Sequence, residues 1–297
     1  MEKILILGGN GFLGSSLVSQ LNKSMTVISG IRSTSKKIKD QNIVILDYLD
    51  QDTLFHNINM IRPDLIVNCI GIASVDRCEQ YPDVASNVMI NNLKLLCDVI
   101  NSISVPLIHI STDQIFSKPT KHVFSESDKT SPCNYYGELK LAAEQVVFRA
   151  HEQAVVLRTN FFGLSKSNVS SSAEILLSEL QCFGVYKGFY DVWFTPVHTS
   201  IIGEIIKNYK KLEYNEIYNI SCNEVLSKYD FAKLLSAKFG FDVNCIIPIS
   251  VDSFHFKAKR SKNMALSNKK IKTLLPSVDF SLNHSINSYF NERLVLS

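Results

Sequence analysis

Residues 4–14 read Ile4-Leu5-Ile6-Leu7-Gly8-Gly9-Asn10-Gly11-Phe12-Leu13-Gly14. Four apolar residues predict a buried strand, and the glycines that follow open a segment with helical periodicity. One glycine permits a tight turn, another lets the backbone approach a phosphate, and a third lets helix and strand pack closely. The N–H groups at the start of such a helix attract an anion. This context predicts a turn that binds a dinucleotide.

Further short apolar runs alternate with helical segments along the chain. The runs are Thr26–Ser29, Ile43–Leu46, Leu65–Cys69, Leu107–Ser111 and Ala154–Leu157. The helical segments are Phe12–Leu21, Asp52–Ile61, Pro82–Ser102, Tyr136–His151 and Ala173–Cys182. Strands that are apolar throughout need helices on both faces of their sheet. The alternation therefore predicts an α/β fold with a Rossmann-type, doubly wound parallel sheet.

The alternation loosens after residue 160, and a second regular stretch begins near Pro196. We therefore expect an NAD(P)-binding Rossmann domain over residues 1–163 and a smaller C-terminal substrate-binding lobe over residues 164–297. Residues from about 189 to 221 are expected to return to the Rossmann domain.

Composition narrows the class of protein. The chain has 31 basic and 28 acidic residues, so its formal charge of +3 lacks the basic excess of a nucleic-acid-binding domain. The seven cysteines lack paired spacing, which is typical of reduced thiols, and the seven histidines lack zinc-ligand spacing, so no metal is expected. No apolar run is long enough for a signal peptide or a membrane helix, so a cytoplasmic protein is expected. The composition leaves the oligomeric state open, a homodimer included.

Two Tyr-x-x-x-Lys pairs occur, Tyr136/Lys140 and Tyr229/Lys233. Residues four apart share one face of a helix. Tyr136 follows Ser111-Thr112-Asp113, which stands at the carboxyl end of a predicted strand, where doubly wound sheets bind ligands. This position favours Tyr136/Lys140 as the functional pair, and Tyr229 is expected to pack at the start of a late helix.

The functional pair predicts acid–base chemistry. An ammonium beside a phenol lowers the pKa of that phenol, which is otherwise near 10. Tyr136 would then protonate a carbonyl oxygen as hydride arrives at its carbon, and Thr112 would donate a hydrogen bond to the same oxygen.

The end of the second predicted strand bears on the choice of cofactor. An enzyme that prefers NAD usually has a carboxylate there to hold the ribose 2′-OH. This chain has Ser29-Gly30-Ile31-Arg32-Ser33 instead, and Arg32 could pair with a 2′-phosphate. NADPH is therefore the expected cofactor, with NADH as the alternative. Asp47 and Tyr48 are expected to flank the adenine.

With these residues identified, the chain resembles extended short-chain dehydrogenases, and within them the dTDP-4-dehydrorhamnose reductase group of sugar-nucleotide reductases. The resemblance covers nearly the whole length. Its motifs are Gly8–Gly14, Arg62-Pro63-Asp64 with Val67-Asn68, Val75-Asp76 with Glu79, Ser111-Thr112-Asp113 with Phe116, Pro132–Lys140 with Leu141 and Glu144, Arg158-Thr159 and Leu266.

The resemblance implies reduction of a 4-keto group on a nucleotide-activated deoxysugar, for a cell-surface polysaccharide precursor. It implies that Tyr136 donates the proton, Lys140 holds the nicotinamide ribose and tunes Tyr136, and Thr112 contacts the reacting oxygen. The implied cofactor contacts are Gly8, Asn10, Gly11, Phe12, Leu13, Arg32, Asp47, Tyr48, Cys69, Ile70, Gly71, Ser111, Tyr136 and Lys140. The implied substrate contacts are Thr112, Asp113, Gln114, Phe161, Trp193 and Arg260, and residues 191–196 would face the diphosphate.

Departures from the family pattern leave the sugar open. Gln114 replaces the usual tyrosine, Leu139 replaces a hydroxyl residue, Met89 falls near an expected asparagine, and a serine follows Arg260. Because an amide is not a base, Gln114 disfavours sugar dehydration. A sugar-nucleotide epimerase remains an alternative. So does a non-catalytic regulatory subunit that keeps the fold and binds nucleotide, as the beta subunit of methionine adenosyltransferase illustrates.

Overall fold

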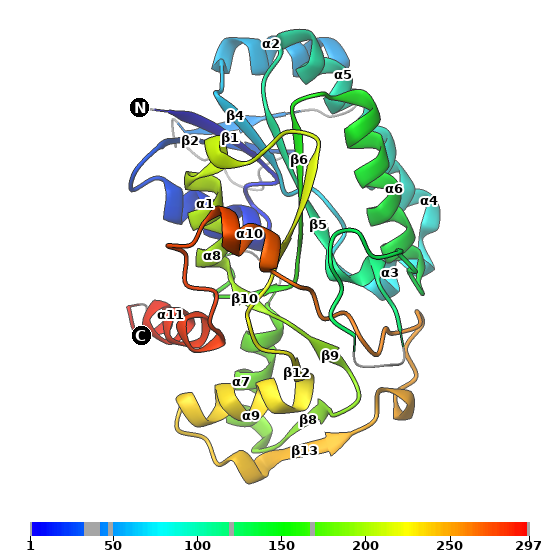
Figure 1. Ribbon diagram of the computed structural model, residues 1–297, viewed down its shortest axis with the longest axis vertical. Coiled ribbons are helices and arrows are strands. Elements are labelled where there is room, and N and C mark those ends of the chain that lie inside the picture. Colours follow the sequence, from blue (N-terminus) through cyan, green and yellow to red (C-terminus); the bar gives the residue numbers. More distant parts are fainter. Residues whose placement is uncertain (1, 33–41, 47–49, 119–121, 167–169, 296–297) are drawn as a thin grey trace.

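A seven-stranded parallel sheet forms the centre of the computed structural model, which describes residues 2–32, 42–46, 50–118, 122–166 and 170–295. The strands lie in the order β11–β6–β5–β4–β1–β2–β3 (Figure 1). Their bounds are β1 (Lys3–Leu7), β2 (Thr26–Ile31), β3 (Ile43–Ile45), β4 (Leu65–Asn68), β5 (Leu107–Thr112), β6 (Ala154–Thr159) and β11 (Glu216–Ile220). The predicted α/β class and doubly wound parallel sheet are confirmed.

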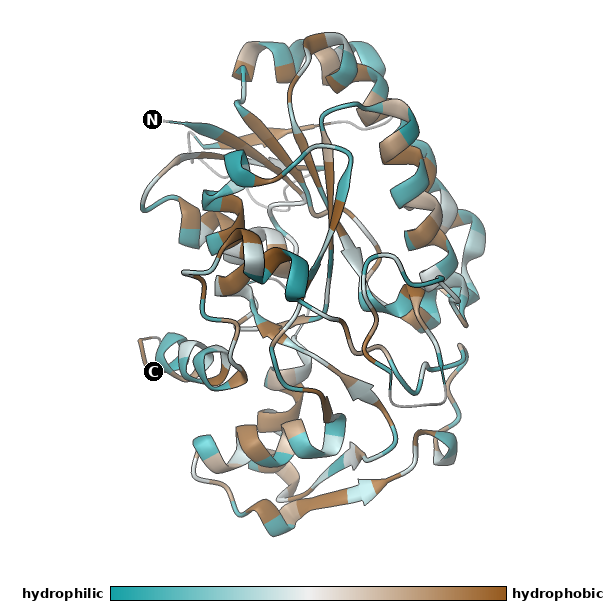
Figure 2. Ribbon diagram, in the orientation of Figure 1, coloured by the Kyte–Doolittle hydropathy of each residue, from teal (hydrophilic) through white to brown (hydrophobic). Residues whose placement is uncertain are grey.

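Helices cover both faces of this sheet. Because successive side chains of a strand point to opposite faces, Ile4 and Ile6 of β1 pack with α1 (Phe12–Leu21) and α8 (Thr199–Lys207). Leu5 and Leu7 pack on the other face with α2 (Gln51–Ile61), α5 (Asn92–Ile103) and α6 (Tyr135–Ala150). The strands are coloured as hydrophobic along most of their length, as Figure 2 shows. Each buried Leu or Ile contributes about 1.5–3 kcal/mol.

A short helix and a divided helix lie between β4 and β5. The short helix is α3 (Val75–Gln80), which the sequence analysis did not predict. The segment predicted as one helix over Pro82–Ser102 consists of α4 (Pro82–Ser86), a π-helical turn (Asn87–Asn91) and α5. Met89 lies within the π-helical turn.

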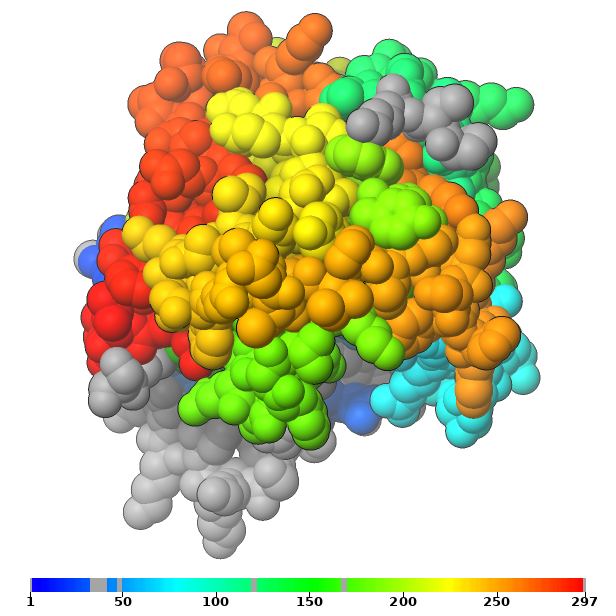
Figure 3. Space-filling view, turned by 90° about the horizontal axis from the view of Figure 1, so that it is seen from below, coloured from blue at the N-terminus to red at the C-terminus, as the bar shows by residue number. Residues whose placement is uncertain are grey.

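A second lobe lies below the sheet in Figure 1. It contains α7 (Ser172–Phe183), β8 (Tyr186–Phe189), β9 (Trp193–Phe194), β12 (Leu226–Ser227), α9 (Lys228–Lys238) and β13 (Ile246–Ile249). β8 pairs with β13 in parallel and β9 pairs with β12 antiparallel, so segments far apart in sequence form this lobe. Viewed from below, its yellow and orange segments spread across the face, beside the red C-terminal helix (Figure 3).

The chain crosses between the two parts several times. β7 (Phe161–Phe162) pairs with β10 (Val197–His198), after which α8 packs against α1 and β11 joins the edge of the main sheet beside β6. Near the C-terminus, α10 (Lys269–Leu274) contacts β11, and α11 (Leu282–Leu294) contacts α8, α9 and β10. Single turns of 3-10 helix are Asp113–Ile115, Tyr209–Lys211, Val243–Cys245 and Val251–Ser253. Within the described ranges, no helix is both long and apolar enough to span a bilayer.

Candidate active site

An open cavity of about 630 Å³ lies at the carboxyl ends of the central strands, beside the second lobe. It brings together thirteen of the residues predicted for the site. These are Gly11, Phe12, Leu13, Cys69, Ile70, Gly71, Ser111, Thr112, Asp113, Gln114, Tyr136, Lys140 and Phe161. The residues come from the first glycine turn, from the ends of β4 and β5, from α6 and from β7, so the sheet topology creates the site.

The glycine turn has the geometry of an anion cradle. Gly8 has φ +76°, in the left-handed region that favours glycine, and its carbonyl oxygen accepts a hydrogen bond from Gly11 N at 2.9 Å. A Cβ on Gly14 would lie 2.2 Å from that same oxygen, so only glycine fits there. Gly11 has no side chain to cap the first N–H groups of α1. These groups fit a pyrophosphate, which is the part of a dinucleotide that the sequence predicted here.

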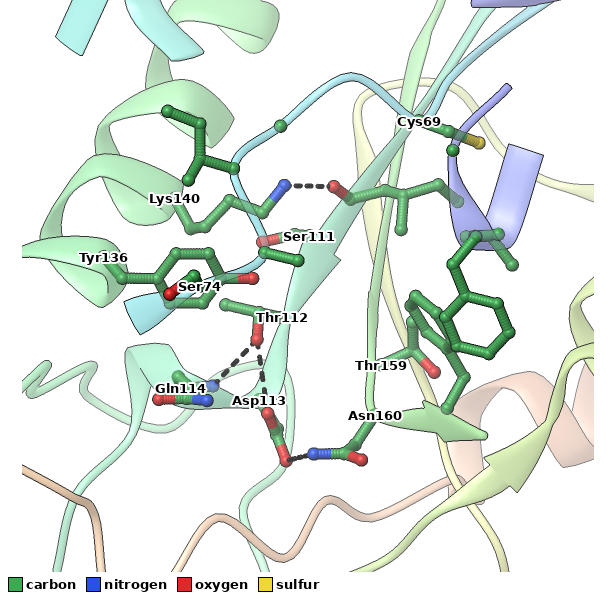
Figure 4. A pocket seen from close by; sticks show the side chains of 18 of the residues that line it. Cys69, Ser74, Ser111, Thr112, Asp113, Gln114, Tyr136, Lys140, Thr159 and Asn160 are labelled. Carbon is green, nitrogen blue, oxygen red and sulfur yellow. Dashed lines mark hydrogen bonds between the residues drawn. The ribbon is translucent and has the colours of Figure 1, made fainter. Parts of the chain in front are cut away.

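Tyr136 and Lys140 lie one turn apart on α6 and both line the cavity (Figure 4). The N-cap residue Asn134 begins this helix by accepting a hydrogen bond from Gly137 N at 2.9 Å. The phenol of Tyr136 points toward the end of β5 in Figure 4, where it meets the Thr112 hydroxyl. Lys140 Nζ donates to the carbonyl oxygen of Ile110 at 2.6 Å.

The pKa of Tyr136 differs from the expectation. Burial raises it to about 12, the charges of Asp113 and Cys78 act in the same direction, and a hydrogen bond with Thr112 opposes them. The prediction that Lys140 lowers the pKa of Tyr136 is therefore wrong for this structure. The physical reason is orientation, because the ammonium donates to the backbone of β5 instead of the phenol. Burial also lowers the pKa of Lys140 to about 8.

A polar chain runs from Thr112 across the floor of the cavity. The Thr112 hydroxyl donates to Asp113 Oδ1 at 3.2 Å and accepts from Gln114 N at 3.3 Å. Asp113 Oδ2 accepts from Asn160 Nδ2 at 2.8 Å (Figure 4). Burial raises the pKa of Asp113 to about 6, although these hydrogen bonds and the Lys228 ammonium lower it. The floor therefore combines hydroxyl, carboxyl and amide groups, which are suited to sugar hydroxyls.

Several predicted residues lie away from this cavity. Gly8 and Asn10 belong to the glycine turn without lining the cavity, and Arg32 is exposed just after β2. Trp193 is half-buried in β9, also outside the cavity lining. Asp47 and Tyr48 fall outside the described residues.

Arg260 also lies outside the cavity lining and already has an anionic partner. Its Nη2 donates to Asp76 Oδ2 of α3 at 2.6 Å, and its guanidinium lies 4.2 Å from the centre of the Phe256 ring. In this structure Arg260 therefore joins the second lobe to α3, whereas the expectation was a substrate contact.

The cavity also contains residues that the sequence analysis did not select. They are Ile72, Ala73, Ser74, Arg77, Ile110, Thr159, Asn160, Ser170, Ser171 and Ser172. Thr159 Oγ1 is buried and lacks a hydrogen-bond partner among the described residues. The sequence did contain a signal for Thr159 and Asn160. These two polar residues closely follow the predicted strand Ala154–Leu157, and the residues that follow the strands of such a sheet form its ligand site.

The second Tyr-x-x-x-Lys pair lies in the lobe, at the beginning of α9. Lys233 Nζ lies 5.5 Å from the centre of the Tyr229 ring, and the backbone and ring of Tyr229 pack against Gly188 of β8. The expectation that Tyr229 is a packing residue agrees with these contacts. The described residues contain no cluster of three or more His, Cys, Asp or Glu side chains arranged to hold a metal ion.

The model of the RmlD substrate binding domain family matches residues 1–293 of this chain. The chain belongs to that family. This RmlD-family chain is 28% identical over 283 residues to methionine adenosyltransferase 2 subunit beta of Mus musculus, covering 92% of this chain and 82% of the relative. It is 26% identical over 275 residues to the spore coat polysaccharide biosynthesis protein SpsK of Bacillus subtilis, covering 91% of each.

A solved structure supports the fold of this RmlD-family chain. The dTDP-4-dehydrorhamnose reductase of Bacillus anthracis, in complex with NADP, superposes with a TM-score of 0.85. The match covers 98% of this chain and 99% of that one, at 22% identity. The resemblance to extended short-chain dehydrogenases is thus confirmed at the level of family and fold.

Proposed function

We propose that this protein is an NADPH-dependent reductase of the 4-keto group on a nucleotide-activated deoxysugar. One observation carries the proposal: a single cavity holds the uncapped glycine turn, the Tyr136/Lys140 pair and Thr112. Three comparisons support NADPH-dependent reduction of a sugar nucleotide. They are the RmlD family, the solved reductase structure with bound NADP and the relative in polysaccharide biosynthesis. The product would serve a cell-surface polysaccharide precursor.

The roles of the residues follow from their positions. Gly11, Phe12 and Leu13 would hold the pyrophosphate of the cofactor, with Gly8 and Asn10 shaping the turn, and Cys69, Ile70, Gly71 and Ser111 would line the path to the nicotinamide. When bound, NADPH would supply the hydride. The second lobe, built by residues 172–194 and 226–249, would place the nucleotide of the substrate, and binding energy from this remote group orients the sugar.

Proton transfer is the task of Tyr136. With a pKa of about 12 its phenol is protonated at neutral pH, which is the state that a general acid requires. The Thr112 hydroxyl would donate to the same carbonyl oxygen, and the buried Lys140 ammonium would hold the nicotinamide ribose of the cofactor. Asp113, Gln114, Asn160 and Phe161 would contact the sugar.

The decisive experiment is NADPH oxidation with a panel of 4-keto sugar nucleotides. We expect turnover with at least one of them, and absorbance at 340 nm follows the reaction. Binding of NADPH without turnover of the whole panel would contradict the reductase and favour the regulatory role, and the chain is also similar to a methionine adenosyltransferase subunit. Interconversion of two sugar nucleotides without net oxidation of NADPH would indicate an epimerase.

The preference for NADPH rests on Arg32. We propose that its guanidinium, exposed after β2, pairs with the 2′-phosphate. Arg32→Ala should raise the KM for NADPH by about 10-fold or more, which is the effect of losing one charged hydrogen bond, and leave that for NADH unchanged. An equal rise in the KM values for NADPH and NADH would contradict this role of Arg32.

We further propose a cytoplasmic homodimer that does not bind nucleic acid. The balanced charge supports the last point. Light scattering during size-exclusion chromatography measures the oligomeric state, and a monomer at micromolar concentration would contradict the dimer.

A further inference from the structure

Three charged side chains are buried together in and behind the cavity wall. Lys140, Glu144 and Arg158 expose only 7%, 2% and 3% of their surfaces. Buried charges are costly unless each has a partner. The partners of these three therefore show how the fold maintains a charged lysine in the site.

Glu144 is at the centre of the group. Its carboxylate accepts from Arg158 Nη2 at 2.7 Å and Nε at 3.0 Å, which is a bidentate pair between α6 and β6. It also accepts from the Ser111 hydroxyl at 2.5 Å. Ser111 directly precedes Thr112 at the end of β5. One carboxylate thus connects α6 to the ends of two central strands beside the cavity.

Lys140 lies one helical turn before Glu144, on the same face of α6. The lysine donates to the Ile110 carbonyl, a neutral group, so that bond supplies no countercharge. Glu144 is the group that most strongly opposes the effect of burial on the pKa of Lys140. Glu144 also pairs with Arg158, so this one carboxylate is the negative charge shared by the two buried cations.

We infer that Glu144 is a positioning residue that supplies the negative charge balancing the buried Lys140 ammonium and fixes Ser111 and Thr112 against α6. The inference rests on the proposed function only in naming Lys140 and Thr112 as parts of the reaction. Other groups that face Lys140 are Tyr136 on α6, Cys69 after β4, Cys78 on α3 and His109 on β5. Burial holds the two thiols and the imidazole in their neutral forms near pH 7, so none of them replaces Glu144.

The first test is the pH dependence of kcat/KM and of NADPH affinity. Glu144→Gln should move the alkaline limb, where Lys140 loses its proton, to lower pH by about one unit or more, because the opposite charge one helical turn away in the buried group is lost. Glu144→Asp, which keeps the charge, should restore most of the profile. Glu138→Gln, which removes an exposed carboxylate from the same helix, should leave the profile unchanged.

A second test does not depend on cofactor or substrate. The free energy of unfolding is measured for Glu144→Gln, Lys140→Met and the double variant at pH 7. We expect the double variant to be more stable than the sum of the two single effects predicts, because Lys140→Met removes the ammonium that Glu144→Gln leaves unbalanced. If Glu144→Gln does not fold, Glu144→Gln with Arg158→Met removes both members of the pair and should fold better.

Additive unfolding energies together with an unshifted pH profile would overturn the inference and leave Glu144 with a purely structural role. If every 4-keto sugar fails with the native protein while the unfolding energies remain non-additive, the proposed reaction is refuted and the role of Glu144 stands.

Discussion

Tyr136 is buried against Thr112 at the end of β5, whereas the ammonium of Lys140, one turn away on α6, donates to the backbone carbonyl of Ile110. The sequence placed Tyr136, Lys140 and Thr112 together, and the cavity contains all three. It did not predict the pKa of Tyr136, because that value depends on burial and on where the Lys140 ammonium points. Both depend on contacts between residues that are far apart in the chain.

Tyr136→Phe should lower kcat by about 10²–10⁴-fold, the usual contribution of a general acid, while NADPH still binds. Tyr229→Phe is the matched control, because it changes the other Tyr-x-x-x-Lys pair. Kinetics with a 4-keto sugar nucleotide and NADPH titration check both. Near-native turnover by the Tyr136 variant would remove this residue from the mechanism.

Asp113 provides a pH-dependent prediction. Its pKa in the folded protein is about 6, above the value of 3.9 usual for an unfolded chain, so the folded state holds this proton more tightly. The contribution of Asp113 to stability is therefore lost as pH rises from about 4 to about 6. Asp113→Asn should raise the free energy of unfolding at pH 7.5 by on the order of 1–3 kcal/mol.

The same variant should show no gain at pH 3.5, where the aspartic acid is already neutral. The new amide can donate to the Thr112 hydroxyl and accept from Asn160, so both hydrogen bonds have a replacement. Denaturant unfolding at the two pH values checks this. If the variant and the native protein differed equally in free energy of unfolding at both pH values, burial of the ionised Asp113 carboxylate would not be what destabilises the native protein. Activity should fall, because the carboxylate is one of the proposed sugar contacts.

At the scale of elements, apolar runs and helical periodicity located most of the fold. The predicted strand and helix cores agree with the structure, and α1 agrees at both ends. β11 was missed as a separate strand because Glu216 and Asn219 interrupt its apolar pattern. The π-helical turn at Asn87–Asn91 was missed because an extra residue in one turn leaves the local composition unchanged.

The β1–α1 connection carries a prediction for the glycine turn. Gly14→Ala places a Cβ 2.2 Å from the Gly8 carbonyl oxygen, so α1 must move away from β1. We expect a lower melting temperature together with a loss of NADPH affinity. Gly71→Ala is the control for stability, because among the residues that the structure describes its Cβ would meet only Lys140 Nζ, at 4.0 Å. An unchanged melting temperature for Gly14→Ala would show that the turn tolerates a side chain.

At the scale of the whole molecule, the two parts meet where residues 257–260 contact α3. Asp76 accepts from Ala258 N at 2.9 Å and pairs with Arg260, and Lys257 Nζ donates to Gln80 Oε1 at 2.7 Å. Sequence reasoning identified Asp76 as part of a family motif and Arg260 as an implied substrate contact. Their pairing joins residues 184 positions apart, which no local pattern reveals.

Asp76→Asn should change the free energy of unfolding by less than about 1 kcal/mol, because the ion pair is partly exposed. It should nevertheless raise the KM for the sugar nucleotide by about 5–10-fold, equivalent to about 1 kcal/mol, because the lobe loses an attachment beside the cavity. Asp252→Asn breaks the exposed Lys262 pair and serves as control. Identical KM values in both variants would show that this contact does not affect substrate binding.

The repeated crossings between the main sheet and the lower lobe restrict how this protein can be divided. Residues 172–194 and 226–249 build the lobe, while α8, which packs on α1, and β11, which pairs with β6, lie between them in the chain and belong with the main sheet. A single break in the gene cannot yield two fragments that each contain one complete part. Recombination that transfers substrate preference between relatives would need several junctions, so in this architecture new specificities are more accessible through point substitutions than through exchange of a module.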